Sequence, residues 1–471
     1  MSEGPRRPGK GGGTDKGGRD REANRLGRRL QRYAKVGAGV GGFAARAAGA
    51  QLFGGDQADA RLARELKMAL GGLKGPIMKV AQMLATVPDM VPAEFAAELS
   101  ELQSSAPPMG WPFVKRRMRA ELGPGWEKRF GSFEREAAAA ASLGQVHRAV
   151  SLQGERLAVK LQYPDMQSAV DADLKQLSLI FSIHRRMDRA INTREIQAEI
   201  AERLHEELDY RREAAHIRLY AEIFRDDPRI TVPEVFDGLS TGRLLTMNWL
   251  DGAPILSFRD HPLDSRNRIA EIMFTAWWRP FSRYGVIHGD PHLGNYSVRE
   301  GEVADEWGIN LLDYGCIRIF PPAFVAGVVE LYHALETDDR DRAAAAYENW
   351  GFRDLSSELI DVLNVWARFI YAPMLDDRVR SVADGIKPGE YGRKEAFGVH
   401  KRLRELGPVT PPREFVFMDR AAIGLGSVFL HLGAELNFHR LFNEAIEKFD
   451  MQELDKRQKA ALKKAGVPPV S

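Results

Sequence analysis

Cysteine is almost absent from this sequence, since Cys316 is the single one among 471 residues. One thiol cannot form an intramolecular disulfide, so a reducing compartment is the default expectation. No secretory signal is visible, because the first apolar run begins only near Val36. We therefore expect a cytoplasmic protein.

Long hydrophobic runs are also scarce. The run "VGAGVGGFAARAAGAQLFGG" contains the pair Gly37 and Gly41, a close-packing spacing of membrane helices, but Arg46 lies inside it and alanine and glycine provide little apolar area. We expect a membrane-docking segment rather than a span, and a plain glycine-rich linker remains an alternative. The late apolar segment 421–434 is too short to span a membrane and predicts a buried helix.

Charge of neither sign dominates the whole chain, whose formal net charge is +2. Residues 1–36 nevertheless carry eleven Lys/Arg against four Asp/Glu, within a glycine-rich composition that predicts disorder up to about residue 25. Such an arm can contact an anionic membrane or simply solubilise the chain. We expect no nucleic-acid partner, and we expect that deleting residues 1–56 reduces association with anionic liposomes.

The rest of the chain has the composition of a globular protein, 44% hydrophobic and 28% charged. Hydrophobic periodicity and proline-rich breaks divide it. The predicted parts are a basic arm and Gly/Ala-rich segment (1–56), a helical leader (57–112), a small lobe of strands and helices (113–250), a mostly helical lobe (251–450) and a polar tail (451–471). This order predicts a helical leader, then a small α+β lobe, then a mostly helical lobe.

The segment "VIHGDPHLGN" (286–295) carries the first chemical motif. Asp290 precedes Asn295 by five residues, as in the kinase catalytic loop, and "LLDYG" then places Asp313 where kinases have the aspartate of D-F-G. Phosphoryl transfer needs a base near the γ-phosphate and oxygen ligands for Mg²⁺. We assign the base to Asp290 and the metal ligands to Asn295 and Asp313. A structural turn rich in Gly, Pro, Asp and Asn is the alternative.

Upstream, "LAVKLQ" places Lys160 within an alternating strand, as in the kinase strand whose lysine holds the α- and β-phosphates. Its glutamate partner should come from the acidic helix at 195–222, although periodicity alone does not choose which. Where a kinase has its glycine-rich loop, this chain has "EAAAAASLGQVHRA" (136–149). Alanine does not adopt positive φ readily, so we expect this loop to be stiffer.

Together these residues resemble the UbiB family of atypical protein-kinase-like proteins. The resemblance implies an α+β, bilobal, protein-kinase-like fold with an added helical leader. The resemblance covers about residues 60–440 and depends on "AAAASLGQVH", "ELDYRREA" and the leader segment "KVAQML". The family's leader motif is K-x-G-Q, and Ala81 stands here in place of its glycine. The resemblance implies that Glu213 pairs with Lys160. It also implies a regulatory group formed by the leader and an E-x-D pair, comprising Lys79, Gln82, Glu207 and Asp209.

The resemblance further implies ATP or ADP and Mg²⁺ as cofactors. Tyr314 replaces the phenylalanine of D-F-G, and the segment "TMNWLDG" becomes the hinge that offers its backbone to adenine. The nucleotide-binding residues implied in this way, besides Lys160, are Ala139, Ala140, Ala141, Ser142, Gln145, Met247, Asn248 and Trp249.

In this family the leader lies across the active site, which implies an ATPase or lipid-directed kinase shielded from protein substrates. The expected role is support of ubiquinone biosynthesis, peripherally at the inner face of the membrane. Expected partners are a nucleotide, a membrane lipid or quinone precursor, and a second copy of the chain or other proteins of quinone biosynthesis. Two alternatives remain open, a small-molecule phosphotransferase of the aminoglycoside or choline kinase type and a nucleotide-binding scaffold without turnover.

Overall fold

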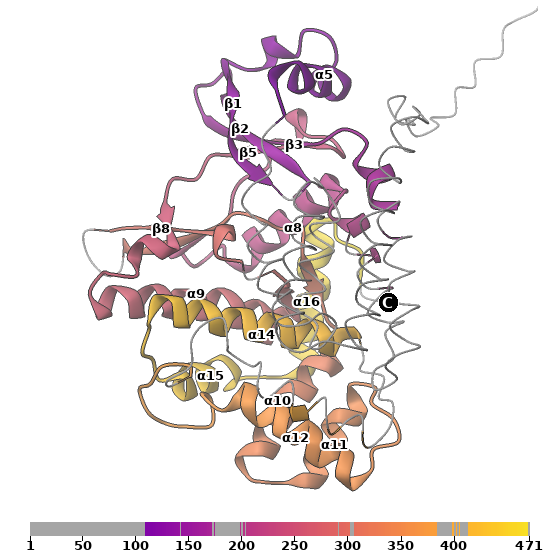
Figure 1. The fold of residues 1–471 in the computed structure, drawn as a ribbon, viewed down its shortest axis with the longest axis vertical. Helices are drawn as coiled ribbons and strands as arrows, with labels where there is room; N and C mark the ends of the chain where they lie inside the picture. Colours follow the sequence, from indigo (N-terminus) through magenta and orange to yellow (C-terminus); the bar gives the residue numbers. More distant parts are fainter. Residues whose placement is uncertain are drawn as a thin grey trace, which may run out of the picture.

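The computed structural model describes residues 109–469, with gaps at 142, 172–173, 175–197, 199–200, 203, 291, 302–305, 384–397, 400–401, 403–404 and 406–412. The expectations for the basic arm and for most of the leader therefore lie outside the described residues. Within them the chain forms a smaller lobe built on a sheet and a larger helical lobe (Figure 1). The predicted α+β, bilobal architecture is confirmed.

The smaller lobe contains a four-stranded antiparallel sheet of order β1-β2-β3-β5. Its strands are Ser132–Ala141, Gly144–Val150, Arg156–Gln162 and Leu244–Asn248. Alternation along β3 divides the two faces. Leu157, Val159 and Leu161 pack in one apolar cluster with helix α5, whereas Ala158 packs in another with helix α8 (Tyr210–Ile223). Lys160 has the same parity as Ala158 and therefore faces α8.

Helix α5, Trp111–Leu122, corrects the predicted start of the smaller lobe. The sequence predicts that a proline-rich break ends the leader at residue 112 and that the smaller lobe begins at residue 113. The proline that suggested a break, Pro112, lies in the first turn of the helix, where the missing N–H has no intrahelical partner to lose. Val114 and Met118, one turn apart, bury its inner face against the sheet.

The alanine run, which the sequence predicts to be a stiff loop, forms the end of strand β1. Ala139, Ala140 and Ala141 in β1 pair with β2 opposite Val146, Gln145 and Gly144. The close approach of β2 to β3 requires the glycine, because a Cβ at Gly144 would lie 2.1 Å from the carbonyl oxygen of Leu161. The second half of β1, residues 137–141, therefore presents only methyl side chains at this edge of the sheet.

The larger lobe is built around the apolar helix α9, Leu263–Tyr284. Two small sheets contact this helix. One has the strand order β10-β7 and the other has the order β4-β9-β8-β6. Their strands are Ile317–Ile319 with Val286–His288, and Ile230–Thr231, Gly308–Leu311, Tyr296–Arg299 and Ala253–Pro254. The later helices are α10 Pro322–Glu336, α11 Arg340–Asn349, α12 Ser357–Tyr371, α14 Arg413–Leu432, α15 Phe438–Ile446 and α16 Met451–Ala465. Short 3₁₀ turns cover Trp126–Arg129, Asp237–Leu239, Ile255–Phe258 and Leu293–Asn295.

Helix α16 corrects the expected polar tail at 451–471. Leu454, Gln458 and Leu462 recur at spacing four and are buried, while the remaining faces carry the charges that made the segment look like a tail. Figure 1 shows α16 beside α8 at the junction of the lobes, and it also contacts α9 and α10. The C-terminal helix therefore belongs to the core.

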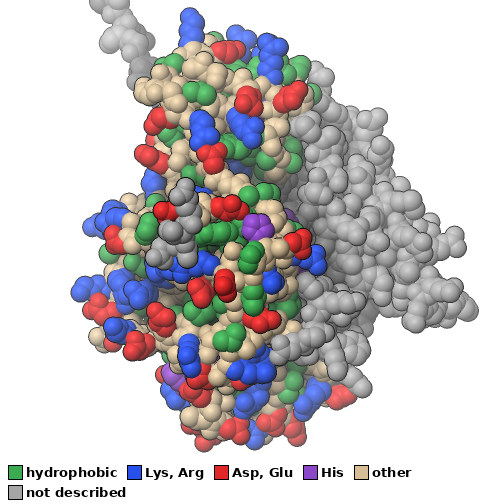
Figure 2. Space-filling view, turned by 90° about the vertical axis from the view of Figure 1, so that its left-hand side faces the viewer, with side chains coloured by type: hydrophobic (Ala, Val, Ile, Leu, Met, Phe, Trp, Pro, Cys, Tyr) green, Lys and Arg blue, Asp and Glu red, His purple; other side chains and the backbone are tan. Residues whose placement is uncertain are grey.

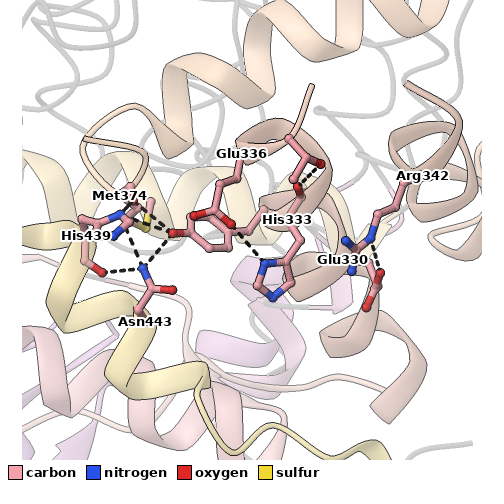
Figure 3. Close-up of polar contacts among 9 residues, drawn as sticks. Glu330, His333, Glu336, Arg342, Met374, His439 and Asn443 are labelled. Atoms are coloured by element: carbon pink, nitrogen blue, oxygen red, sulfur yellow. Dashed lines mark hydrogen bonds and ion pairs between the residues drawn. The ribbon is translucent and has the colours of Figure 1, made fainter. Parts of the chain in front are cut away.

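Polar contacts fasten the far end of the larger lobe (Figure 3). The ring of His439 bonds to the carbonyl oxygen of Met374 at 2.8 Å, and Asn443 donates to the hydroxyl of Tyr332 at 2.8 Å. These contacts join α15 to α10 and to the turn after α12. They lie away from the motifs that predicted chemistry, so they hold the scaffold rather than a site.

Acidic and basic side chains are intermixed on the face of the molecule that Figure 2 displays. A continuous basic stripe, the usual sign of a nucleic-acid-binding face, is not seen on this view. Among the helices that the structure describes, none combines the length and apolar character required to cross a membrane.

Candidate active site

Lys160 on β3 lies at the centre of the candidate site. Its Nζ is 2.6 Å from Oε1 of Glu213 and 3.0 Å from Oδ2 of Asp313, and the lysine and glutamate side chains are only 10% and 3% exposed. Burial by itself lowers the pKa of Lys160, but the carboxylates of Asp313 and Glu213 raise that pKa well above its usual value. The lysine therefore stays protonated, as a ligand for phosphate must.

Helix α8 brings Glu213 to the lysine. Asp209 begins the helix as its N-cap, where Oδ1 accepts the backbone N–H groups of Arg211 and Arg212. Glu213 follows one turn later on the buried face. His216, three residues further along the same face, bonds through Nδ1 to the carbonyl oxygen of Tyr314 at 3.1 Å. One helix face thus contacts both the lysine strand and the D-Y-G segment.

The loop after β7 carries the predicted base and one predicted metal ligand. Nδ1 of His288 accepts the N–H of Asp290 at 3.2 Å, so the ring proton resides on Nε2, which donates to the carbonyl oxygen of Asp313 at 2.7 Å. The side-chain amide of Asn295 donates to the carbonyl oxygen of Asp290 at 3.0 Å, and the backbone carbonyl oxygen of Asn295 accepts the N–H of Leu312 at 3.0 Å. The two motifs, distant in sequence, form one unit.

The D-Y-G segment is held beneath α8. The side chain of Tyr314 is fully buried, donates its hydroxyl to the carbonyl of Leu311 at 3.1 Å, and packs edge-on against Tyr220 of α8 with ring centroids 5.4 Å apart. Oδ1 of Asp313 accepts the N–H of Gly315 at 3.0 Å. Packing of this aromatic residue distinguishes active from inactive arrangements in kinases, and here it lies under the helix that carries the glutamate.

Gly289 explains why the loop reads H-G-D rather than H-R-D. Its N–H donates to the carbonyl oxygen of Cys316 at 2.7 Å. A Cβ at this position would lie 2.9 Å from that oxygen and 3.1 Å from Sγ of Cys316, so no larger side chain fits without displacing the neighbouring strand.

The predicted phosphate loop is only partly described. Ala139, Ala140 and Ala141 lie at the end of β1, and Ser142 is outside the described residues. Gln145 is buried, accepts the N–H of Met109 at 2.7 Å and donates to its carbonyl oxygen at 3.3 Å, so its amide joins the chain before α5 to β2. Contact of these residues with phosphate stays a prediction.

The predicted hinge, residues 247–249, covers the end of β5 and the residue after it. The N–H of Asn248 donates to the carbonyl of Glu234 at 3.1 Å, and that of Trp249 donates to the carbonyl of Arg156 at 2.8 Å. These two donors are used within the protein, so in this conformation adenine would meet other groups of the segment. Met247 pairs with Ala158 on β3, on the sheet face shared with Lys160. Adenine contact at 247–249 remains a prediction.

The leader residues Lys79 and Gln82 are outside the described residues. Of their expected partners, Asp209 caps α8, and Glu207 lies against the D-Y-G segment, with its Cγ 3.7 Å from where a Cβ on Gly315 would be. Glu207 is therefore next to the candidate metal ligand Asp313. Contact between this pair and the leader stays a prediction.

The donor set fits a magnesium ion that is also held by a nucleotide. Mg²⁺ is commonly bound by one or two protein oxygens together with substrate phosphates and water. Among the described residues, no group of three or more His, Cys, Asp and Glu could hold a metal ion by itself. Asp313 is 34% exposed, and the amide nitrogen of Asn295 is committed to Asp290, which leaves the side-chain oxygen of Asn295 as its ligand atom.

Comparison with known proteins assigns the chain to a family. A family model described as "ABC1 atypical kinase-like domain" matches residues 101–347, more than half of the chain. The chain belongs to the UbiB family of ABC1 atypical kinases. The predicted family is confirmed, and the chain is an enzyme of the kinase-like, ATP-dependent phosphoryl-transfer class.

Individual relatives of this UbiB-family chain have low sequence identity to it, but several match most of its length. "Atypical kinase COQ8, mitochondrial" of Saccharomyces cerevisiae is 26% identical over 382 residues, which are 79% of this chain and 74% of the yeast protein. "Atypical kinase COQ8B, mitochondrial" of Danio rerio is 25% identical over 90% of this chain and 68% of its own. The chloroplastic "Protein ACTIVITY OF BC1 COMPLEX KINASE 1" of Arabidopsis thaliana is 32% identical over 59% of this chain, which spans 42% of that relative.

A solved structure has a similar fold. The structure described as "The complex structure of Rv3197-erythromycin from Mycobacterium tuberculosis" superposes with a TM-score of 0.55 at 28% sequence identity, over 82% of this chain and 96% of that one. This similarity supports the kinase-like fold of the UbiB-family chain.

Two histidines that connect parts of the candidate site are absent from the residues predicted from the sequence. His288 joins the catalytic loop to Asp313, and His216 joins α8 to Tyr314. The signal for His288 was its place in the H-x-D spacing. The signal for His216 was weaker, namely its position three residues after Glu213 on a helix.

Proposed function

We propose that this UbiB-family enzyme binds ATP or ADP with Mg²⁺ and acts as a kinase-like ATPase that supports biosynthesis of ubiquinone or a related isoprenoid quinone. The observation that carries the proposal is the position of Lys160, between the carboxylates of Glu213 and Asp313. Active phosphoryl-transfer sites of kinases require this lysine–glutamate pair and this aspartate to be in place together.

The residues divide the work as follows. The ammonium of Lys160 binds the α- and β-phosphates, and Glu213 keeps it oriented. Asp313 and Asn295 would hold Mg²⁺, which neutralises charge on the β- and γ-phosphates when bound. Asp290 accepts the proton of the attacking oxygen while that oxygen forms its bond to the γ-phosphorus and the bond to the β-phosphate oxygen breaks. With water as the attacking molecule, the products are ADP and inorganic phosphate.

The acceptor distinguishes an ATPase from a kinase. We propose that the helical leader, through Lys79 and Gln82, covers the site near Glu207 and Asp209 and excludes peptides. Glu207 supports this idea because it already lies beside the D-Y-G segment. The mitochondrial and chloroplastic names of the relatives agree with a role in membranes that hold quinones. Because the similar Mycobacterium tuberculosis structure is described as a complex with erythromycin, small organic molecules are the competing class of ligand.

Isothermal titration of Mg-ADP and Mg-ATP into the full chain tests nucleotide binding. Asp313→Asn removes a charged metal ligand, so its Mg²⁺-dependent affinity should fall at least about tenfold, the lower range for disturbed metal sites. Asp361→Asn, an exposed aspartate on α12, is the control. Unchanged affinity in Asp313→Asn would remove the metal role.

ATP turnover with anionic liposomes and a phenolic quinone precursor then tests the proposed role. Stimulation by lipid and phenol supports the ATPase of quinone biosynthesis. Stimulation by an amino alcohol or an aminoglycoside instead supports a small-molecule phosphotransferase, and phosphorylation of a peptide would contradict shielding by the leader.

A further inference from the structure

Glu206 forms a buried ionic bridge that none of the site motifs includes. Its Oε2 lies 2.9 Å from a guanidinium nitrogen of Arg318, and its Oε1 forms an ion pair with Arg212. The side chains of Glu206 and Arg318 are 11% and 9% exposed. A pair this well buried is poorly screened by water, so removing one partner weakens the balance of charge at this junction.

The two arginines belong to different parts of the site. Arg212 is on the first turn of α8, immediately before Glu213. Arg318 is on β10. The residue before it on the same strand, Ile317, pairs with His288 on β7. Arg318 also passes beside Gly289, with its Cγ 3.9 Å from where a Cβ on that glycine would be. The carboxylate therefore joins the helix that carries the lysine's partner to the strand next to the catalytic loop.

Kinases often control this same junction with a phosphate. Phosphorylation of the segment after D-F-G orders it through arginine–phosphate pairs, and the position of the helix sets whether the lysine–glutamate pair forms. In this chain Gly289 replaces the arginine of H-R-D, and the space beside it contains the side chain of Arg318. An anion between α8 and β10 is already supplied by the protein itself.

We propose that Glu206 is a positioning residue whose carboxylate permanently takes the part of an activating phosphate, holding α8 against β10 so that Glu213 meets Lys160. The enzyme then needs no phosphorylation of the segment after Asp313 to form its site. The turnover readout of this proposal rests on the proposed ATPase function, whereas the geometry does not.

Other contacts also hold α8 in place, and they limit how much activity is lost when the Glu206 bridge is removed. His216 bonds to the carbonyl of Tyr314, and Lys464 of α16 forms an ion pair with Glu222 of α8. Loss of the Glu206 bridge should therefore loosen α8 without releasing it. We expect kcat to decrease about tenfold, since the loss of one hydrogen bond between charged groups changes an equilibrium constant by roughly a factor of ten.

The chain provides a matched control in Glu121. Its side chain is 7% exposed and also bridges two arginines, Arg117 at 3.3 Å and Arg243 at 2.9 Å. Glu121 is on α5, and that helix packs on the opposite face of the sheet from α8. Glu121→Gln therefore reproduces the loss of a buried bridging charge without breaking the link to β10.

The experiment compares Glu206→Gln, Arg318→Gln, their double variant and Glu121→Gln in the full chain. Hydrogen exchange of the amides in Tyr210–Ile223 is measured together with kcat and KM for Mg-ATP. The proposal expects faster exchange in α8 and a lower kcat, with KM changed less than about twofold, in both single variants. The decrease in kcat of the double variant should be no larger than that of either single variant. Glu206→Asp should recover part of kcat.

Unchanged exchange in Glu206→Gln, equal loosening of α8 in Glu121→Gln, or losses that multiply in the double variant would each overturn the proposal. Absence of ATP turnover in the unmodified enzyme is a different result. It would contradict the proposed ATPase function, and the exchange measurement would still decide the role of Glu206.

Discussion

Lys160 and Asp313 lie 3.0 Å apart, Nζ to Oδ2, although 153 residues separate them in the sequence. In phosphoryl transfer the lysine serves the phosphates and the aspartate serves the metal ion. Here the two charges compensate each other, while Glu213 contacts the lysine from α8. On the proposed function, binding of Mg-nucleotide would exchange this contact within the protein for two contacts with the ligand, which would couple metal and nucleotide binding.

Lys160→Met should weaken Mg-nucleotide binding by at least about tenfold and destabilise the fold most at neutral pH. Breaking a buried pair costs about 3–5 kcal/mol. Burial raises the pKa of Glu213, and Lys160 counteracts that effect, so the variant should bind a proton at Glu213 more readily in the folded state. A carboxyl with a raised folded pKa loses stability as pH rises, so the difference in unfolding free energy from the unmodified protein should be larger at about pH 7.5 than at about pH 5.

Urea unfolding of both proteins at the two pH values measures this difference. Lys459→Met on the exposed side of α16 is the control and should show no pH-dependent change. An equal difference at both pH values would mean that Glu213 is not held in its charged form by Lys160.

Asp290→Asn should keep Mg-nucleotide affinity within about twofold and lower kcat by about 10²–10⁴-fold, the usual contribution of a general base. The backbone of Asp290 is tied to His288 and Asn295 by N–H and carbonyl groups that the substitution retains, so the loop should stay in place. Single-turnover hydrolysis and calorimetric binding provide the two measurements. Normal turnover in this variant would refute the assignment of the base.

Gly289→Ala should destabilise the fold by about 1–3 kcal/mol, the usual cost of an overpacked position. The new methyl group would meet the carbonyl oxygen and Sγ of Cys316 at 2.9 and 3.1 Å. Gly238→Ala is the matched control, because a Cβ there has no atom within 4 Å and its φ is not positive. Thermal unfolding should show a large decrease in stability for Gly289→Ala and almost none for Gly238→Ala. Equal decreases in the two variants would contradict the close packing at Gly289.

Local spacing made much of the candidate site predictable. Lys160 in an alternating strand, and Asp290 five residues before Asn295, are patterns set by short-range chemistry, and the structure brings their loop and strand to Asp313. Choosing Glu213 among the acidic residues of its helix needed the resemblance to a family. Its observed contact depends on packing between elements 53 residues apart, which periodicity does not encode.

What sequence reasoning missed has a common physical cause. The charges of helix α16 outnumber its buried residues and so favour a polar tail, although Leu454, Gln458 and Leu462 repeat at spacing four. Pro112 favours a break unless it lies in the first turn of a helix, which is where packing of α5 on the sheet places it. The bridge at Glu206 joins residues 112 positions apart, so no local signal marks it. Long-range pairing decides these features.

Asp227→Asn should remove stability that depends on pH. The carboxylate of Asp227 bonds to Arg229 and forms an ion pair with Arg279 of α9 at 2.8 Å. The hydrogen bonds from Arg229 lower the pKa of Asp227 to about 2 from its usual value of 3.8. A lowered carboxyl pKa contributes stability above the unfolded pKa, here about 2 kcal/mol, which is lost as pH falls from about 4 toward 2.

The measurement is the unfolding free energy of both proteins in urea at about pH 7, 5 and 3. The difference between them should be constant at the two higher values and smaller at the lowest. Asp361→Asn, on the surface of α12, should change stability little at every pH. A difference that persists unchanged at about pH 3 would show that the carboxylate charge does not contribute.

Gln458→Leu tests whether the C-terminal helix supports the catalytic loop. The buried amide of Gln458 donates to the carbonyl oxygens of Tyr284 at 2.8 Å and Phe320 at 2.9 Å, at the ends that lead into β7 and out of β10. Leucine fits the volume but leaves both carbonyls without that donor, so the fold should lose about 2–6 kcal/mol, at about 1–3 kcal/mol for each of the two unsatisfied groups.

Because β7 carries His288 and β10 carries Arg318, the loss should also reach the site. Hydrogen exchange of residues 286–288 and 317–319 should become faster in Gln458→Leu, and kcat should fall more than nucleotide affinity. Lys459→Ala, one residue further along the same helix and exposed, should leave both unchanged. A destabilised Gln458→Leu protein with unchanged exchange in these strands would mean that α16 stabilises the lobes without acting on the loop.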